Sequence, residues 1–186
     1  MGAGILPTTI HENKLYFLFG KENKFADTPG WCDFGGGTEK GESFMTTTLR
    51  EGTEELTGFL GSEKDLSKML KKHGTYKIMF NENKYQMSLF PMKYDPMLPF
   101  YYNNNQKFLQ KRLDPEVIKN TKIFEKAEIK WVCVDDLKKM RSQFRPYFQK
   151  VSDEIFDKRE DIYKFISPCL RENGQHRRTR KNRNRK

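Results

Sequence analysis

Three carboxylates lie close together within one short segment of the chain, from Gly36 to Gly58, which reads GGTEKGESFMTTTLREGTEELTG. Glu51, Glu54 and Glu55 fall in a stretch that predicts a helix, just after a glycine turn. Residues three and four apart share one face of a helix, so Glu51 should lie beside both of the others. Like charges at this spacing repel by roughly 0.2–0.5 kcal/mol per pair. A divalent cation such as Mg²⁺ would offset that repulsion, because hard cations take carboxylate oxygens as ligands and bind beside phosphates.

A row of acidic residues on a helix is more often a solvated surface than a metal site. For an isolated Glu-x-x-Glu-Glu triplet we would prefer the surface interpretation. The residues upstream change this preference, because a Gly-Gly pair, Glu42 and Arg50 precede the triplet at regular spacings.

These spacings resemble the Nudix box, in which Gly, Glu, Arg-Glu and Glu-Glu recur at fixed intervals. The matching residues are Gly36, Glu42, Arg50, Glu51, Glu54 and Glu55. The preceding Trp-Cys-Asp-Phe-Gly-Gly also resembles the family's Trp-x-Phe-Pro-Gly-Gly, with Phe34 where Pro is usual. The resemblance covers roughly residues 3 to 166, strongly at the box and weakly elsewhere.

The segment departs from the family pattern at three places. Gly52 occupies an aliphatic position, and Gly within a helix costs about 0.5–1 kcal/mol relative to Ala. The closing glycine comes one residue late, at Gly58, with Thr57 in its usual place. Thr46, Thr47 and Thr48 stand where small helix formers are typical. These departures predict altered helix rigidity and exit geometry, and they remove no carboxylate.

The resemblance implies hydrolysis of a nucleoside diphosphate linked to another moiety, with Mg²⁺ or Mn²⁺ as cofactor. It implies catalytic roles for Glu54, Glu51, Arg50 and Glu42, the last two as an ion pair that anchors the loop to the helix. It implies metal ligands at Glu51, Glu54 and Glu55, a backbone carbonyl at Gly35 or Gly36, and a further Glu from the second half of the chain. Glu128 is our first candidate for that Glu and Glu125 the second.

Substrate contacts are less well marked. Tyr101 and Tyr102, with Phe100, would suit a surface on which a base stacks. Phe-Tyr-Tyr is also an ordinary core sequence, and from the residues alone core is the preferred interpretation.

The hydrophobic pattern predicts an α/β fold, and with the resemblance an α/β/α sandwich: a mixed β-sheet between the box helix and a C-terminal helix. Expected strands are residues 5–10, 15–19, 76–80, 84–94 and 128–134. Expected helices are residues 62–73, 103–113, a short one after Asp114-Pro115, and 146–166. We expect one Nudix-type domain over residues 1–166 and a basic, disordered tail over residues 167–186.

The composition of the chain indicates its cellular compartment. The three cysteines are odd in number and scattered, which favours reduced thiols in an intracellular protein over a disulfide framework. No apolar run approaches the roughly 20 residues that cross a membrane, and the N-terminus lacks the features of a signal peptide. We therefore expect a cytoplasmic protein, or a nuclear one directed by the basic tail, that has no membrane partner. It could be a monomer or a homodimer.

The net charge of +10 is uneven, since residues 167–186 carry +7 of it. Tail residues Arg177, Arg178, Arg180, Lys181 and Arg183 would suit contacts with nucleic-acid phosphates, a localisation signal or a solubilising end. An RNA-binding tail would suit a hydrolase that removes the 5′ cap of mRNA. The alternatives are a housekeeping hydrolase of free nucleotides, nucleotide sugars or inositol pyrophosphates, and a non-catalytic RNA-binding module of the same fold.

Overall fold

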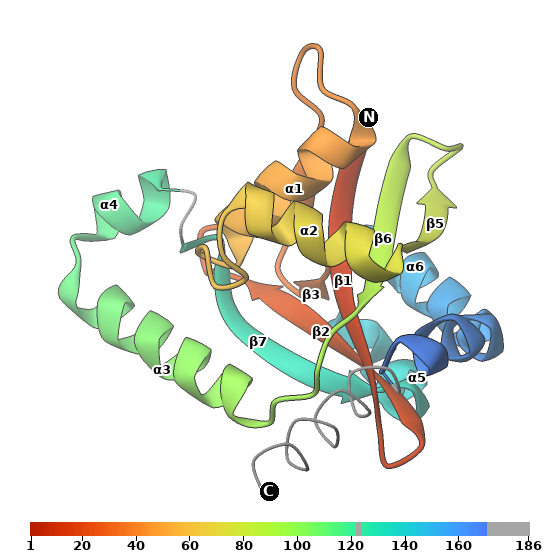
Figure 1. The fold of residues 1–186 in the computed structure, drawn as a ribbon. Helices are drawn as coiled ribbons and strands as arrows, with labels where there is room; N and C mark the ends of the chain where they lie inside the picture. The colour runs from red at the N-terminus through yellow and green to blue at the C-terminus, as the bar shows by residue number, and fades with distance from the viewer. Residues whose placement is uncertain (122–123, 171–186) are drawn as a thin grey trace, which may run out of the picture.

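A mixed seven-stranded sheet forms the centre of the molecule (Figure 1), whose computed structural model describes residues 1–121 and 124–170. Its strands are β1 (Gly2–His11), β2 (Lys14–Glu22), β3 (Trp31–Cys32), β4 (Phe34–Gly37), β5 (Tyr76–Phe80), β6 (Tyr85–Pro91) and β7 (Lys126–Cys133). Its longer helices are α1 (Phe44–Glu55), α2 (Glu63–His73), α3 (Met97–Arg112) and α6 (Pro146–Asp157). Shorter helices are α4 (Pro115–Asn120), α5 (Leu137–Met140) and two 3-10 turns, Val134–Asp136 and Arg141–Gln143.

Strand β1 organises the sheet. It pairs antiparallel with β4 along its first half and with β2 near its end, and it pairs parallel with β6 on its other side. Strands β7 and β3 extend the sheet from β2, and β5 extends it from β6. Strand β4 lies directly beside β1, and the chain that leaves β4 forms a loop beyond the N-terminal end of β1 before α1, which packs on β1 and β4 (Figure 1).

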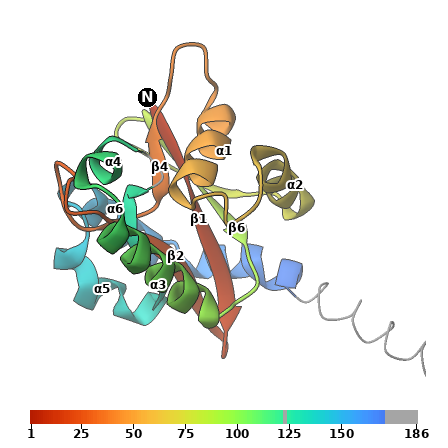
Figure 2. The same ribbon diagram turned by 90° about the vertical axis from the view of Figure 1, so that its left-hand side faces the viewer.

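Helices cover both faces of this sheet, as Figures 1 and 2 show together. One core contains Leu6, Phe17 and Phe19 and packs against α5 and α6. The other contains Ile5 and Leu18 and packs against α1, α2 and α3. Successive strand residues point to opposite faces, so the apolar runs of β1 and β2 supply both cores. The expected α/β/α sandwich with a mixed sheet is confirmed.

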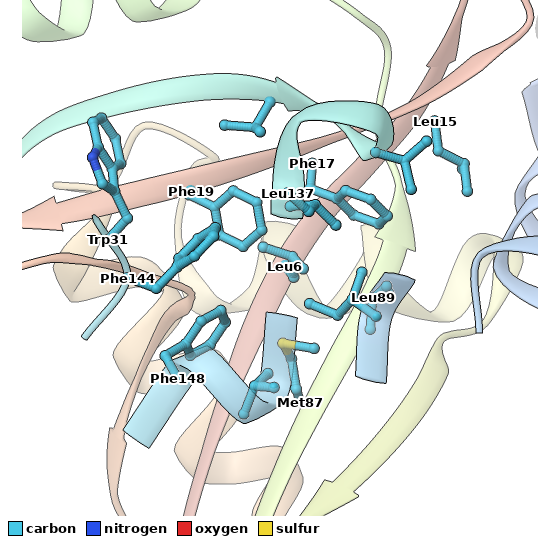
Figure 3. Packing of buried hydrophobic residues seen from close by; sticks show 14 of the residues in the cluster. Leu6, Leu15, Phe17, Phe19, Trp31, Met87, Leu89, Leu137, Phe144 and Phe148 are labelled. Atoms are coloured by element: carbon cyan, nitrogen blue, oxygen red, sulfur yellow. The ribbon is translucent and has the colours of Figure 1, made fainter. Parts of the chain in front are cut away.

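Aromatic rings fill the core beneath α6 (Figure 3). The ring of Phe19 meets those of Phe144 and Phe148 edge-on, with centroids 5.0 and 5.9 Å apart. All three side chains are buried. This packing fixes the start of α6 against β2, and so also the neighbouring Arg145.

Two helices differ from the predicted ones. Helix α3 begins at Met97, six residues earlier than expected, because Pro99 falls in its first turn, where the missing amide hydrogen is not needed. The C-terminal helix turns at Lys158, and residues 159–170 are again helical. Helical structure thus passes Ser167, where we expected the tail to begin. The five basic residues singled out in the tail lie outside the described residues.

Among residues 1–121 and 124–170, no helix combines the length and the apolar character needed to cross a bilayer.

Candidate active site

Helix α1 is held at its start by its threonines and a serine cap. Ser43 Oγ accepts a hydrogen bond from the Thr46 amide at 3.1 Å. Thr47 is buried and its hydroxyl donates to Glu42 Oε2 at 2.8 Å. Thr48 donates to the Phe44 carbonyl at 2.7 Å. Threonines that looked like weak helix formers therefore supply contacts that fix the loop on the helix.

Arg50 joins the loop to the helix. Its guanidinium donates two hydrogen bonds to Glu42, from Nε at 2.8 Å and from Nη2 at 3.0 Å, and Nη2 also donates to the Gly37 carbonyl at 2.9 Å. Nη1 donates to Glu51 Oε1 at 2.7 Å. A bidentate fork of this kind has a defined orientation as well as a favourable energy. The structure thus contains the Arg50–Glu42 ion pair that the resemblance implies.

The double glycine lets β4 approach Glu51. A Cβ added to Gly36 would overlap Glu51 Oε1 and lie 2.8 Å from Oε2. Gly35 faces the other way, toward the Tyr85 hydroxyl and the Gly4 backbone. Gly36 is therefore the glycine that leaves room for the carboxylate.

Three glutamates bring carboxylate oxygens together: Glu51, Glu55 and Glu125 each place one within 4.8 Å of the others. Glu51 and Glu55 are buried, on adjacent turns of α1, and Glu125 immediately precedes β7. Oxygens on opposite sides of one Mg²⁺ lie roughly 4.2 Å apart, so a small movement would let all three bind one ion. Glu54, on the same helix, is 34% exposed in its side chain, and its buried Oε2 lies 3.6 Å from Arg50 Nη1.

A buried lysine stands behind this cluster. Lys126 Nζ lies 3.0 Å from Glu55 Oε1 and 2.5 Å from Glu22 Oε1, and the Lys126 side chain is 1% exposed. Glu22 Oε1 also accepts from Arg145 Nη1 at 2.8 Å. Gly20 makes room for the lysine stem, because a Cβ there would lie 2.9 Å from Lys126 Cδ. Sequence analysis missed Lys126 and Glu22, which are 104 residues apart and carry no local motif.

Tyr102 serves the site as a buried support. Its hydroxyl lies 3.1 Å from the Glu55 carbonyl and 3.2 Å from the Lys126 carbonyl. The residue is 4% exposed, which agrees with the preferred core interpretation and excludes Tyr102 as a surface on which a substrate base stacks. Tyr101, one residue earlier on α3, is 62% exposed on the outside of the helix.

Glu128 does not join the carboxylate cluster, which corrects our first choice for the additional glutamate. Glu128 is paired across the strands with Lys21, and their charged atoms lie 3.5 Å apart. The pairing of β2 and β7 shifts between Lys21 and Glu22, where Lys126 and Glu128 oppose consecutive residues. This bulge changes the face to which side chains point. Sequence alternation alone could not show that Lys126 and Glu128 face opposite sides.

Burial and charge shift the site's pKa values in opposite directions. Burial raises the pKa of Glu55 well above its usual value, although Lys126 opposes the shift. Burial also raises the pKa of Glu125, which Glu51 and Glu22 raise further and Lys126 lowers. Hydrogen bonds from Arg50 lower the pKa of Glu42 to about 2. Glu42 is thus an ionised anchor, whereas protons compete with a cation for the cluster.

The side chains present suit a divalent cation. Glu55 Oε2 is buried and accepts no hydrogen bond, so it has an oxygen to offer. The carboxylates of the site are Glu22, Glu42, Glu51, Glu54, Glu55 and Glu125, against the cations of Arg50, Lys126 and Arg145. When all are ionised, three negative charges remain. Hard, all-oxygen ligands with this excess favour Mg²⁺ or Mn²⁺.

The departures of α1 from the family pattern have local explanations. A Cβ on Gly52 would come within 2.7 Å of Ile5 Cδ1 and 3.1 Å of Leu66 Cδ2, so glycine lets α1 lie close to β1 and α2. At the helix exit Thr57 has φ 53° and Gly58 has φ 68°. Thr57 thus adopts the left-handed conformation that the family's glycine would take without strain.

Comparison with known proteins finds likeness at the level of solved structures. No protein-family model matches this chain, and no curated protein does. A Nudix hydrolase from M. smegmatis, RenU, is similar at 12% identity and a TM-score of 0.49, over 89% of this chain and 87% of that one. A C. elegans Ap4A hydrolase is similar at 14% identity and a TM-score of 0.46, over 90% of this chain and 99% of that one. A MutT protein from Methanosarcina mazei is similar at 16% identity and a TM-score of 0.44, over 86% of this chain and 93% of that one. The first of these carries the family name that the Gly36–Gly58 segment indicates. Because all three TM-scores are below 0.5, the function proposed below rests on this chain's own residues.

Proposed function

We propose that this chain is a Nudix-type pyrophosphohydrolase that uses Mg²⁺ or Mn²⁺ to cleave a nucleoside diphosphate linked to another moiety. The observation that supports this most strongly is the convergence of Glu51, Glu55 and Glu125, within 4.8 Å of one another and largely buried. Surface glutamates on a solvated helix have no reason to be drawn together with a glutamate from another element.

Each side chain has a role in this proposal. Glu51, Glu55 and Glu125 would hold the ion, and a glycine carbonyl of β4 would be a further ligand. A bound divalent cation neutralises charge on the phosphate oxygens and acidifies a water. Glu54, whose side chain is more exposed than those of Glu51 and Glu55, would accept the proton of the attacking water, while Arg50 and Glu42 keep α1 and its loop in register. Lys126 and Tyr102 orient Glu55.

The substrate class is a nucleotide-type pyrophosphate, and we propose the 5′ cap of mRNA as its specific form. A phosphoanhydride concentrates charge at the cleaved bond, which suits a metal cluster. The basic residues 177–183 add an attraction for RNA phosphates. Free nucleotides, nucleotide sugars and inositol pyrophosphates share the reacting group and are the competing substrates.

The test is hydrolysis of a panel with Mg²⁺: capped RNA, free cap dinucleotide, nucleoside triphosphates, Ap4A, ADP-ribose and an inositol pyrophosphate. The enzymes are wild type, Glu55→Gln, and Glu128→Gln as a matched glutamate outside the cluster. We expect the wild type to hydrolyse at least one compound. Glu55→Gln should lower kcat at least 100-fold, which corresponds to about 2.7 kcal/mol in the activation barrier. Glu128→Gln should leave kcat unchanged. Circular dichroism checks that both variants fold.

Absence of turnover across the panel, with RNA still bound, would instead identify a non-catalytic RNA-binding module. Hydrolysis of small nucleotides with no preference for capped RNA would support the enzymatic activity but would exclude the mRNA cap as the specific substrate.

A further inference from the structure

The outer face of α3 carries exposed aromatic rings and cations side by side. Phe100, Tyr101 and Phe108 are 56%, 62% and 57% exposed. Lys107, Lys111 and Arg112 are exposed on the same helix, which contains no acidic residue. Residues three and four apart share a helix face, so these six side chains line one surface, which we call the α3 outer face. Its length from Phe100 to Arg112 is about 18 Å.

The inner side of the same helix supports the candidate active site. Tyr102 is bonded to the backbone of Glu55 and Lys126, and the Asn103 amide pairs with the Ile129 backbone at 2.7 and 3.1 Å. Figures 1 and 2 show α3 along the outside of β7. The helix that carries the outer face is therefore tied directly to the backbone of Glu55, a residue of the carboxylate cluster.

The chemistry of this face fits single-stranded RNA. Exposed rings accept bases by stacking, which is sequence-tolerant, and lysine and arginine bind the phosphates. Arg112 already stacks over Phe108, with its guanidinium carbon 5.4 Å from the ring centroid. Asn104 and Asn105 are exposed and offer donors and acceptors to base edges.

Other occupants fit less well. Two copies of this chain meeting through the face would oppose three cations to three cations, which like-charge repulsion disfavours. A membrane helix needs a continuous apolar strip, and Asn104 and Asn105 interrupt the rings between Tyr101 and Phe108.

We propose that the α3 outer face binds the single-stranded RNA whose 5′ end enters the active site. The choice of RNA rests on the proposed function, because RNA is the polynucleotide that carries a pyrophosphate linkage at its 5′ end. Direct contact with the helix adds to any attraction from residues 171–186.

The experiment measures binding of an unstructured RNA of about 12 nucleotides to the full-length chain in EDTA, over a range of salt. A first variant removes the rings, Phe100→Ala with Tyr101→Ala and Phe108→Ala. A second removes the charges, Lys107→Gln with Lys111→Gln and Arg112→Gln. A matched control removes three exposed lysines elsewhere, Lys77→Gln with Lys130→Gln and Lys150→Gln.

We expect the ring variant to bind at least five-fold more weakly per ring, with an unchanged salt slope. The α3 charge variant should lower the slope of log K against log salt by about 2, whereas the control should leave it nearly unchanged. Equal binding by wild type and ring variant, or equal losses in the α3 charge variant and the control, would overturn the proposal. The proposal would also be overturned if the ring variant lost dimerisation, or binding to lipid vesicles, while its RNA binding stayed unchanged.

Hydrolysis of the free cap dinucleotide separates this proposal from the active-site proposal. If the dinucleotide is hydrolysed but RNA binding does not depend on the α3 residues, only the α3 proposal fails. If RNA binding depends on α3 but nothing is hydrolysed, only the catalytic proposal fails.

Discussion

Glu55 pairs with a buried lysine through one carboxylate oxygen and keeps the other for the cation that we propose. Lys126 occupies Oε1 at 3.0 Å, while Oε2 accepts no hydrogen bond. Two charges buried together need good geometry to repay their desolvation, and here Glu22 and Arg145 complete the network. The lysine thus selects one orientation of Glu55 and leaves the other oxygen without a hydrogen-bond partner.

Gly36→Ala tests the close approach of β4 to Glu51. A Cβ at this position would displace the carboxylate, so we expect metal affinity to fall at least ten-fold, about 1.4 kcal/mol. Gly37→Ala is the matched control, because a Cβ there has no atom within 4 Å. Isothermal titration with Mn²⁺ compares the two, and equal affinities would show that Gly36 does not set the position of Glu51.

Glu42→Gln tests the anchor formed with Arg50. Hydrogen bonds from Arg50 lower the pKa of Glu42 from 4.5 to about 2, so the folded state holds the carboxylate ionised more strongly than the unfolded chain does. The stabilisation is therefore full above pH 4.5 and is lost as pH falls toward 2. Chemical denaturation at several pH values should show Glu42→Gln less stable at pH 7, with the difference shrinking below pH 4.5. A difference that stayed constant with pH would mean that the ion pair contributes nothing.

At the scale of elements, the exit from α1 combines a strained residue with a permissive one. Thr57 and Gly58 both have positive φ, and a β-branched residue rarely adopts that conformation. Thr57→Gly should therefore raise the free energy of unfolding by about 0.5–1 kcal/mol, even though the threonine hydroxyl donates to the Leu56 carbonyl at 2.7 Å. Gly58→Ala should lower it by about 1 kcal/mol. Urea denaturation measures both, and a destabilising Thr57→Gly would show that the hydroxyl outweighs the strain.

Elements with strong local signals could be predicted from the sequence. Ser62 caps α2 with a full capping box, and Asp114-Pro115 starts α4, as their residue types indicate. The ion pair between Glu42 and Arg50 is implied by the resemblance of the Gly36–Gly58 segment, whereas the contact between Arg50 and Glu51 is not predicted. Lys126, Tyr102 and Glu125 could not be placed in this way, since their positions depend on a bulge in β7 and on α3 packing across the chain. Periodicity predicts which face a strand buries but not where an extra residue exchanges the faces.

At the scale of the whole molecule, the candidate site has an excess of carboxylates and, among its charged groups, the outside of α3 carries only cations. The carboxylates gather where α1, β2 and β7 meet, while exposed cations line the outside of α3 and dominate residues 171–186. A polyanionic substrate would meet the cations first and would reach the acidic cluster only with a divalent ion present. Binding should therefore weaken with salt even when cleavage is blocked.

The most direct test of the central claim is a Mn²⁺ titration of wild type, Glu125→Gln and Glu128→Gln. The two variants lose the same charge three residues apart, but only Glu125 lies in the cluster with Glu51 and Glu55. We predict that Glu125→Gln weakens Mn²⁺ binding at least ten-fold, about 1.4 kcal/mol, and that Glu128→Gln binds like wild type. Equal affinities for all three proteins, or a loss confined to Glu128→Gln, would contradict a metal site built from α1 and Glu125.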